Sequence, residues 1–176
     1  MHSKIEGFIT APFRADYPVD HHRDVLDRYR DPSNGELFTE YKVAFDDDWQ
    51  RTLPTADNVR FVGVFDAVLN RAGEVEIGEW KTGKPKDTHG DQRRLYALMA
   101  FQTWEPEVVT ATTYYFDATS KPQILTAKKS AVGKLIKIWN DRHDQIERDT
   151  FHPPRPGFHC RWCDFSRTKA GPCPIA

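Results

Sequence analysis

Two apolar runs separated by a short turn constrain the fold of this chain most strongly. Residues 65–69 form the first run, residues 70–73 contain Asn and Gly, and residues 75–81 form the second run. Apolar segments on both sides of a Gly-containing turn are typical of a β-hairpin. The sequence therefore predicts two paired strands in this part of the chain.

The predicted hairpin carries three charged residues that the pairing brings together. Asp66 lies in the first strand, and Glu79 and Lys81 lie near the end of the second. Residues two apart on a strand point to the same face, so Glu79 and Lys81 project together. Pairing around the turn places Asp66 close to both. The sequence thus predicts two carboxylates and a lysine at one edge of a sheet.

This set of side chains suits a divalent cation beside a phosphate. Mg²⁺ and Mn²⁺ prefer hard oxygen ligands, which Asp66, Glu79 and the main-chain carbonyl of Trp80 can supply. Such a metal polarises a phosphoryl group and lowers the pKa of bound water. Lys81 can position that water or neutralise charge developing on the phosphate. The alternative is an exposed hairpin with scattered charges.

A helix is expected over residues 88–104. Leu95, Leu98 and Met99 recur there at helical spacing. Gln92 and Tyr96 stand four residues apart, so they share one face of this helix.

The overall charge gives no sign of a nucleic-acid partner. The chain has 25 Lys and Arg against 26 Asp and Glu, a net charge of −1, so no global basic field exists. Basic residues do cluster after the acidic pair, at Lys81, Lys84, Lys86, Arg93 and Arg94. Such clusters serve either solubility or phosphate contacts, and this position favours phosphate contacts.

Taken in order, these motifs resemble those of a known nuclease family. Asp66, then Glu79-x-Lys81 followed by Thr82-Gly83, then Gln92-x-x-x-Tyr96 on the next helix, is similar to the RecB-like branch of the PD-(D/E)xK nucleases. The resemblance implies an α/β, restriction-endonuclease-like core with a central mixed sheet flanked by helices. It also implies that Asp66 and Glu79 bind Mg²⁺ or Mn²⁺, that Lys81 is catalytic, and that Gln92 and Tyr96 contact DNA.

The resemblance extends to residues upstream of the hairpin. RecB-like nucleases carry a histidine that joins the metal shell, and His22 occupies a comparable segment, although His21 stands beside it. A surface histidine near a helix start is the alternative. Glu40 matches an acidic position of the family and either contacts a second metal or faces solvent.

Three cysteines lie close together near the C-terminus, at Cys160, Cys163 and Cys173. Clustering of this kind in a Pro- and Gly-rich tail indicates metal ligation. The alternatives are three free thiols, or one disulfide and one spare thiol. Since no segment resembles a signal peptide, we expect a cytosolic protein, in which disulfides are unusual.

The tail is similar to that of the CRISPR-associated and AddB-type iron–sulfur exonucleases, in which three C-terminal cysteines and one upstream cysteine hold a [4Fe–4S] cluster. This chain has no cysteine before Cys160, so the fourth ligand is missing. Three outcomes stay open. His159 or another histidine completes a cluster or a zinc site, the cluster is incomplete and labile, or the tail is a metal-free remnant.

The remaining pattern predicts a single nuclease domain over residues 1–176. It comprises an N-terminal helical segment at 1–35, a core at 36–150 and the Cys-containing tail at 151–176. Residues 1–18 are expected to be irregular, with helices at 21–30 and 127–148 and strands at 36–45 and 108–116. No apolar run is long enough to span a membrane.

The expected function is therefore that of a metal-dependent DNA nuclease, and by resemblance an exonuclease in DNA processing, recombination, repair or CRISPR adaptation. DNA is the expected partner, with other DNA-processing proteins as further candidates. One rival is a catalytically inactive DNA- or partner-binding module on the same fold. A second is a zinc-ribbon-like binding protein that acts through its tail.

Overall fold

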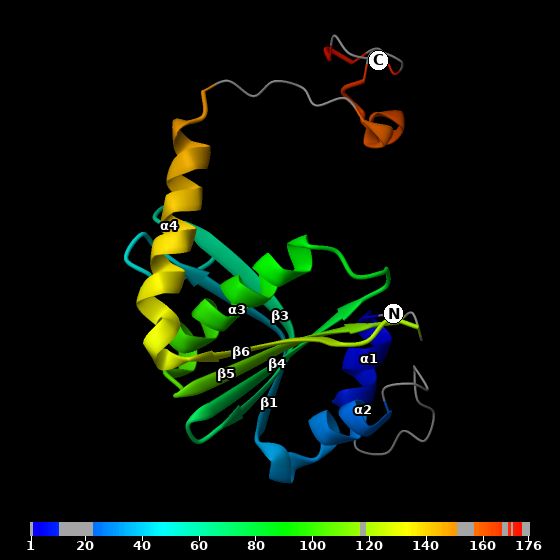
Figure 1. Cartoon of the computed structure of the whole chain (residues 1–176), viewed down its shortest axis with the longest axis vertical. Helices are drawn as coiled ribbons and strands as arrows, with labels where there is room; N and C mark the ends of the chain where they lie inside the picture. Colours follow the sequence, from blue (N-terminus) through cyan, green and yellow to red (C-terminus); the bar gives the residue numbers. More distant parts are fainter. Residues whose placement is uncertain are drawn as a thin grey trace. The chain divides into compact units, whose positions relative to one another are not determined.

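The structure is a computed structural model that describes residues 2–10, 23–116, 119–150, 157–166, 169 and 171–173. The chain separates into two compact units, Met1–Trp139 and Asn140–Ala176. The first unit contains the sheet and the candidate site (Figure 1).

The first unit is built on one mixed sheet of six strands in the order β2-β1-β3-β4-β5-β6. Only β4 and β5 run parallel to each other, and every other neighbouring pair is antiparallel. A parallel pair needs a crossover connection, which the helix α3 provides between these two strands (Figure 1). The strands are β1 (Glu36–Phe45), β2 (Arg51–Thr52), β3 (Phe61–Arg71), β4 (Glu74–Lys81), β5 (Val108–Tyr115) and β6 (Gln123–Lys128).

Helices cover both faces of the sheet. On one face α1 (His2–Ile9) and α2 (Arg23–Arg30) pack through Ile5, Phe8 and Leu26 against a cluster that includes Trp80 of β4. On the other face α3 (Thr88–Trp104) packs against β3, β4 and β5, and the first turns of α4 (Val132–Arg148) join it through Leu135. The result is a three-layer arrangement with the sheet in the middle (Figure 1).

Strand β4 buries apolar side chains on both of its faces. Val75 and Ile77 are buried against α3, whereas Trp80 is buried on the opposite face against α1 and α2. Helices thus cover this central strand on both sides, and the charged side chains of Glu76, Glu79 and Lys81 are held in ion pairs. Gly73 closes the β3–β4 turn with φ +80°, a conformation that glycine adopts without strain.

The predicted α/β core with a mixed sheet is confirmed, as are the hairpin, the helix at 88–104 and the strand at 36–45. The expectation that residues 1–18 are irregular was wrong for α1. The helix predicted from residue 127 begins only at Val132, because β6 runs to Lys128 and a 3₁₀ turn follows it. Of the helix expected at 21–30, α2 covers Arg23–Arg30, and residues 21 and 22 lie outside the described residues.

None of the helices in the described part of the chain combines the length and apolar character needed to span a bilayer.

Candidate active site

Asp66 lies where the pairing of β3 with its neighbours is interrupted. The β3–β4 ladder ends at the pair Ala67–Gly78, and the Asp66 carboxylate then accepts a hydrogen bond from the backbone N–H of Trp80 at 2.8 Å. On the other side, the β1–β3 pairs omit Asp66 and Glu40. Glu40 has φ +46°, which is uncommon for a residue with a side chain. At Asp66, strand β3 is therefore paired neither with β1 nor with β4.

Glu79 is the most buried acidic side chain of the site, with 5% of the residue exposed. Its Oε1 accepts hydrogen bonds from Lys81 Nζ at 2.5 Å and from Gln92 Nε2 at 2.9 Å. Its Oε2 is buried and has no hydrogen-bond partner among the described residues. Because a buried acceptor without a partner costs free energy, this oxygen is positioned for a ligand.

The surroundings of Glu79 favour its protonated form. Burial, and after it the negative charge of Asp66, raises the pKa of Glu79 from 4.5 to about 7, although Lys81 and Gln92 act in the opposite direction. Two carboxylates thus lie near enough to repel each other, and one lysine does not compensate fully. A further positive charge would stabilise the ionised pair.

The donor set fits a hard divalent cation. Asp66 and Glu79 offer carboxylate oxygens, which Mg²⁺ and Mn²⁺ prefer, and Glu79 Oε2 is the buried oxygen that lacks a partner. Within the described ranges, no group of three or more His, Cys, Asp or Glu side chains is arranged to hold a metal. His21 and His22, which the sequence suggested as a further ligand, lie outside the described residues. The carbonyl of Trp80 stays a predicted ligand.

Helix α3 holds the two strands of the site together. Gln92 bonds to Glu79 on β4, and one turn later the Tyr96 hydroxyl donates to the carbonyl of Val64 on β3 at 2.7 Å. The Tyr96 ring also meets Phe65 edge-on, with centroids 5.0 Å apart. Burial, followed by the charge of Glu79, raises the pKa of Tyr96 to about 12. In the structure this pair braces the acidic residues, and its contact with DNA stays a prediction.

The chain matches the sequence model of the PD-(D/E)XK nuclease superfamily over residues 4–168. It belongs to that superfamily. The nucleases of this superfamily are generally hydrolases that use divalent metals such as Mg²⁺.

A solved structure titled "Crystal structure of SSO0001" is similar to this PD-(D/E)XK chain, with 17% identity and a TM-score of 0.43. The similarity covers 88% of this chain and 66% of that one. No curated protein matches the chain.

Sequence reasoning did not identify every residue around the site of this PD-(D/E)XK protein. The sequence predicted no function for His89, and it identified Arg93 only as a member of the basic cluster that follows the acidic pair. Both lie on α3, and they hydrogen-bond to Tyr115 and Thr113 of β5. Their i,i+4 spacing was a usable signal, but only the parallel pairing of β4 with β5 shows that they lie beside the carboxylates.

The tail of the second unit holds the three cysteines as free thiols. Cys160 belongs to a 3₁₀ turn (Phe158–Trp162), and the backbone N–H of Cys163 bonds back to the carbonyl of Cys160 at 3.3 Å. The backbone N–H of Cys173 bonds to the carbonyl of Phe165 at 2.9 Å. Ligation of iron–sulfur or zinc by Cys160, Cys163 and Cys173 stays a prediction.

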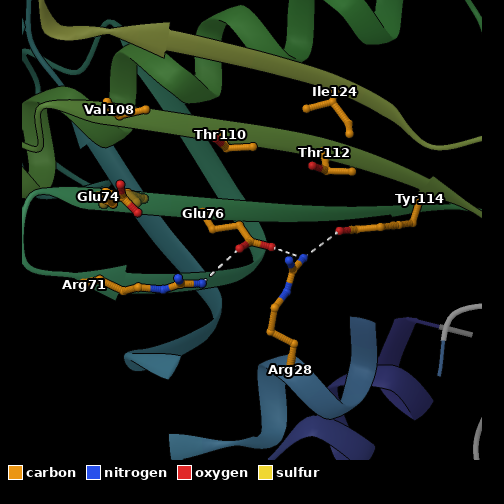
Figure 2. A pocket seen from close by; sticks show the side chains of 10 residues that line it. Arg28, Arg71, Glu74, Glu76, Val108, Thr110, Thr112, Tyr114 and Ile124 are labelled. Atoms are coloured by element: carbon orange, nitrogen blue, oxygen red, sulfur yellow. Dashed lines mark hydrogen bonds and ion pairs between the residues drawn. The ribbon is translucent and has the colours of Figure 1, made fainter. Parts of the chain in front are cut away.

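A cavity of about 320 Å³ lies on the other face of the sheet, where Figure 2 shows its lining side chains. Glu76 is the central acid there, and it pairs with Arg28 of α2 and Arg71 of β3. Arg28 also donates to the Tyr114 hydroxyl at 3.3 Å. Because the central charges satisfy one another, we interpret this network as a structural link between α2 and the sheet.

Proposed function

We propose that this protein is a metal-dependent deoxyribonuclease of the RecB-like branch, acting as an exonuclease in DNA processing, recombination, repair or CRISPR adaptation. The main support for the proposal is the set of contacts made by the buried Glu79 carboxylate. This buried carboxylate has one oxygen without a hydrogen-bond partner in the described part of the chain, lies near a second carboxylate, and bonds to a lysine. In a purely structural ion pair such a buried oxygen costs free energy without any gain, whereas a metal-binding carboxylate uses it as a ligand.

In this proposal Asp66, Glu79, the carbonyl of Trp80 and His22 hold one Mg²⁺ or Mn²⁺. When bound, the metal polarises the phosphodiester and favours ionisation of the attacking water. The Trp80 N–H holds the Asp66 carboxylate in place by the 2.8 Å bond. This restraint keeps the two acids oriented before substrate arrives.

Lys81 supplies the cationic side chain of the proposed reaction. Its ammonium donates to Glu79, yet the side chain is 25% exposed, so it is accessible to an arriving phosphate. Positive charge at this point stabilises the negative charge that develops on the phosphate oxygens. Lys81 can equally orient the attacking water by accepting or donating a hydrogen bond according to its protonation.

Gln92 and Tyr96 are the proposed contacts to the DNA strand. Exonuclease action rests on the resemblance of the Glu79-x-Lys81 and Gln92-x-x-x-Tyr96 motifs to those of the RecB-like branch. We further propose that the cysteine tail holds a [4Fe–4S] cluster or Zn²⁺, and that the whole chain works as one nuclease domain.

Cleavage of end-labelled single- and double-stranded DNA tests the proposal. We expect degradation in Mg²⁺ or Mn²⁺ that EDTA abolishes, with products that shorten progressively from an end. Internal fragments from a circular substrate would identify an endonuclease instead. DNA binding without any cleavage in either metal would contradict nuclease function and favour an inactive binding module.

A further inference from the structure

The positive charges of Lys81, Lys86 and Arg93 all act on His89, on the α3 side of the sheet. Strand β5 runs parallel to β4, with Thr113 opposite Glu79 and Tyr115 opposite Lys81. Neighbouring strands lie about 4.8 Å apart. The side chains of α3 that cover Thr113 and Tyr115 therefore lie one strand away from the candidate metal site.

Arg93 is held in this position by an uncharged partner. Its Nη1 donates to the Thr113 hydroxyl at 2.9 Å, and its Nε is buried without a hydrogen-bond partner. No carboxylate pairs with Arg93 among the residues that the structure describes. The adjacent Arg94 is different, because it is exposed and pairs with Asp91 at 3.0 Å. Arg93 thus keeps its positive charge available for an anion.

His89 occupies the preceding turn of the same helix face. Its Nδ1 lies 2.9 Å from the Tyr115 hydroxyl, which in turn donates to Gln123 of β6 at 3.1 Å. The His89 ring also stacks on the Tyr115 ring, with centroids 5.7 Å apart. Because the Tyr115 hydroxyl donates its proton to Gln123, Nδ1 is the His89 nitrogen that donates to Tyr115. Nε2 can then donate to a phosphate only in the protonated imidazolium form, which a bound phosphate would favour.

The charged groups around His89 affect its protonation. Partial burial lowers the pKa of His89, and Lys81, Lys86 and Arg93 lower it further. At the start of α3 the backbone N–H groups of His89 and Gly90 already donate to the carbonyls of Lys86 and Asp87, at 3.1 and 3.0 Å, so the cationic side chains carry the attraction for an anion.

We propose that Arg93, His89 and Lys86 form a second phosphate-binding site, which holds the phosphate next to the scissile one. The inference rests on the proposed nuclease function. A strand carries a phosphate about every 3.4 Å of helical rise, so a site one strand away from the carboxylates is within reach of an adjacent phosphate. That phosphate is either a flanking phosphodiester or a terminal phosphate.

Salt-dependent DNA binding tests the site. The affinity of the full-length protein for a 20-nucleotide single strand is measured in EDTA at several salt concentrations by fluorescence anisotropy. For Arg93→Gln we expect about tenfold weaker binding. The slope of log affinity against log salt, which is negative, should become less steep by about 0.7, because one phosphate contact is lost. Arg93→Lys should retain most of the slope, since it keeps the charge. Lys86 lies in an exposed stretch, and Lys86→Gln should also make the salt dependence of DNA affinity less steep.

Lys42→Gln, at an exposed lysine of β1 outside the basic cluster, is the control, and its slope should equal that of the wild type. A 5′-phosphorylated, a 3′-phosphorylated and an unphosphorylated strand separate the two phosphate sources. A terminal site predicts that Arg93→Gln loses a preference for one phosphorylated end, whereas a flanking site predicts equal weakening for all three strands. Wild-type slopes for both Arg93→Gln and Lys86→Gln would overturn the inference while leaving nuclease function intact. Absence of both binding and cleavage in the wild type would instead contradict the proposed function.

Discussion

Glu79→Gln is expected to lower the rate of DNA cleavage by about a hundredfold to a thousandfold. Glutamine keeps the shape of the side chain and can still bond to Gln92, but it removes the charge that a divalent cation requires. The measurement is the single-turnover rate on end-labelled DNA in saturating Mn²⁺. The variant should retain DNA binding, because the cationic residues around it are unchanged.

Glu76→Gln is the matched control for this variant. Glu76 lies on the same strand three residues earlier, and it faces the opposite side of the sheet, where it pairs with Arg28 and Arg71. Its replacement should weaken that network and lower stability, yet leave the cleavage rate within about twofold of the wild type. Equal losses for both variants would mean that Glu79 acts through stability alone, which would contradict its catalytic assignment.

The second large effect is a change of stability with pH that depends on Glu79. Its pKa is raised to about 7 from 4.5, so the folded protein holds this proton more tightly than the unfolded chain does. The stabilisation is therefore fully present below pH 4.5 and is lost as the pH rises through 7. A difference of this size corresponds to about 3 kcal/mol.

Thermal unfolding in EDTA and in Mg²⁺ measures this linkage. Between pH 5 and pH 8, the metal-free wild type should lose more stability than Glu79→Gln, and Mg²⁺ should restore it mainly at pH 8, where the carboxylate is ionised. Glu79→Gln should show little Mg²⁺ response at either pH. An identical pH dependence of the two proteins would show that Glu79 is not the group that titrates.

The central hairpin and the helix at 88–104 could be predicted because their patterns are strongly periodic. Residues two apart on a strand share a face, which places Glu79 beside Lys81. Residues four apart on a helix also share a face, which places Gln92 beside Tyr96. Asp66 follows from the turn that pairs the strands. The acidic pair and lysine could thus be placed together from sequence alone.

Other features depended on tertiary contacts that no local pattern records. The eight-residue α1 was missed because the prolines at 12 and 18 suggested an irregular start. Strand β6 alternates between half-buried and exposed residues, and its last residues were assigned to the following helix. The left-handed backbone of Glu40 carries no glycine signal. The position of Arg93 near the carboxylates could be inferred only from the pairing of β4 with β5.

The most direct test of the proposed active site is the cleavage rate of Lys81→Ala beside that of the wild type and of Lys42→Ala, an exposed lysine on β1. All three proteins are first shown to be folded by circular dichroism and to bind Mn²⁺ by electron paramagnetic resonance. We predict that the wild type and Lys42→Ala degrade end-labelled DNA at similar rates, and that Lys81→Ala binds DNA but cleaves it about a hundredfold more slowly or worse. A wild-type cleavage rate for Lys81→Ala would contradict the assignment of the Asp66, Glu79 and Lys81 cluster as the catalytic centre.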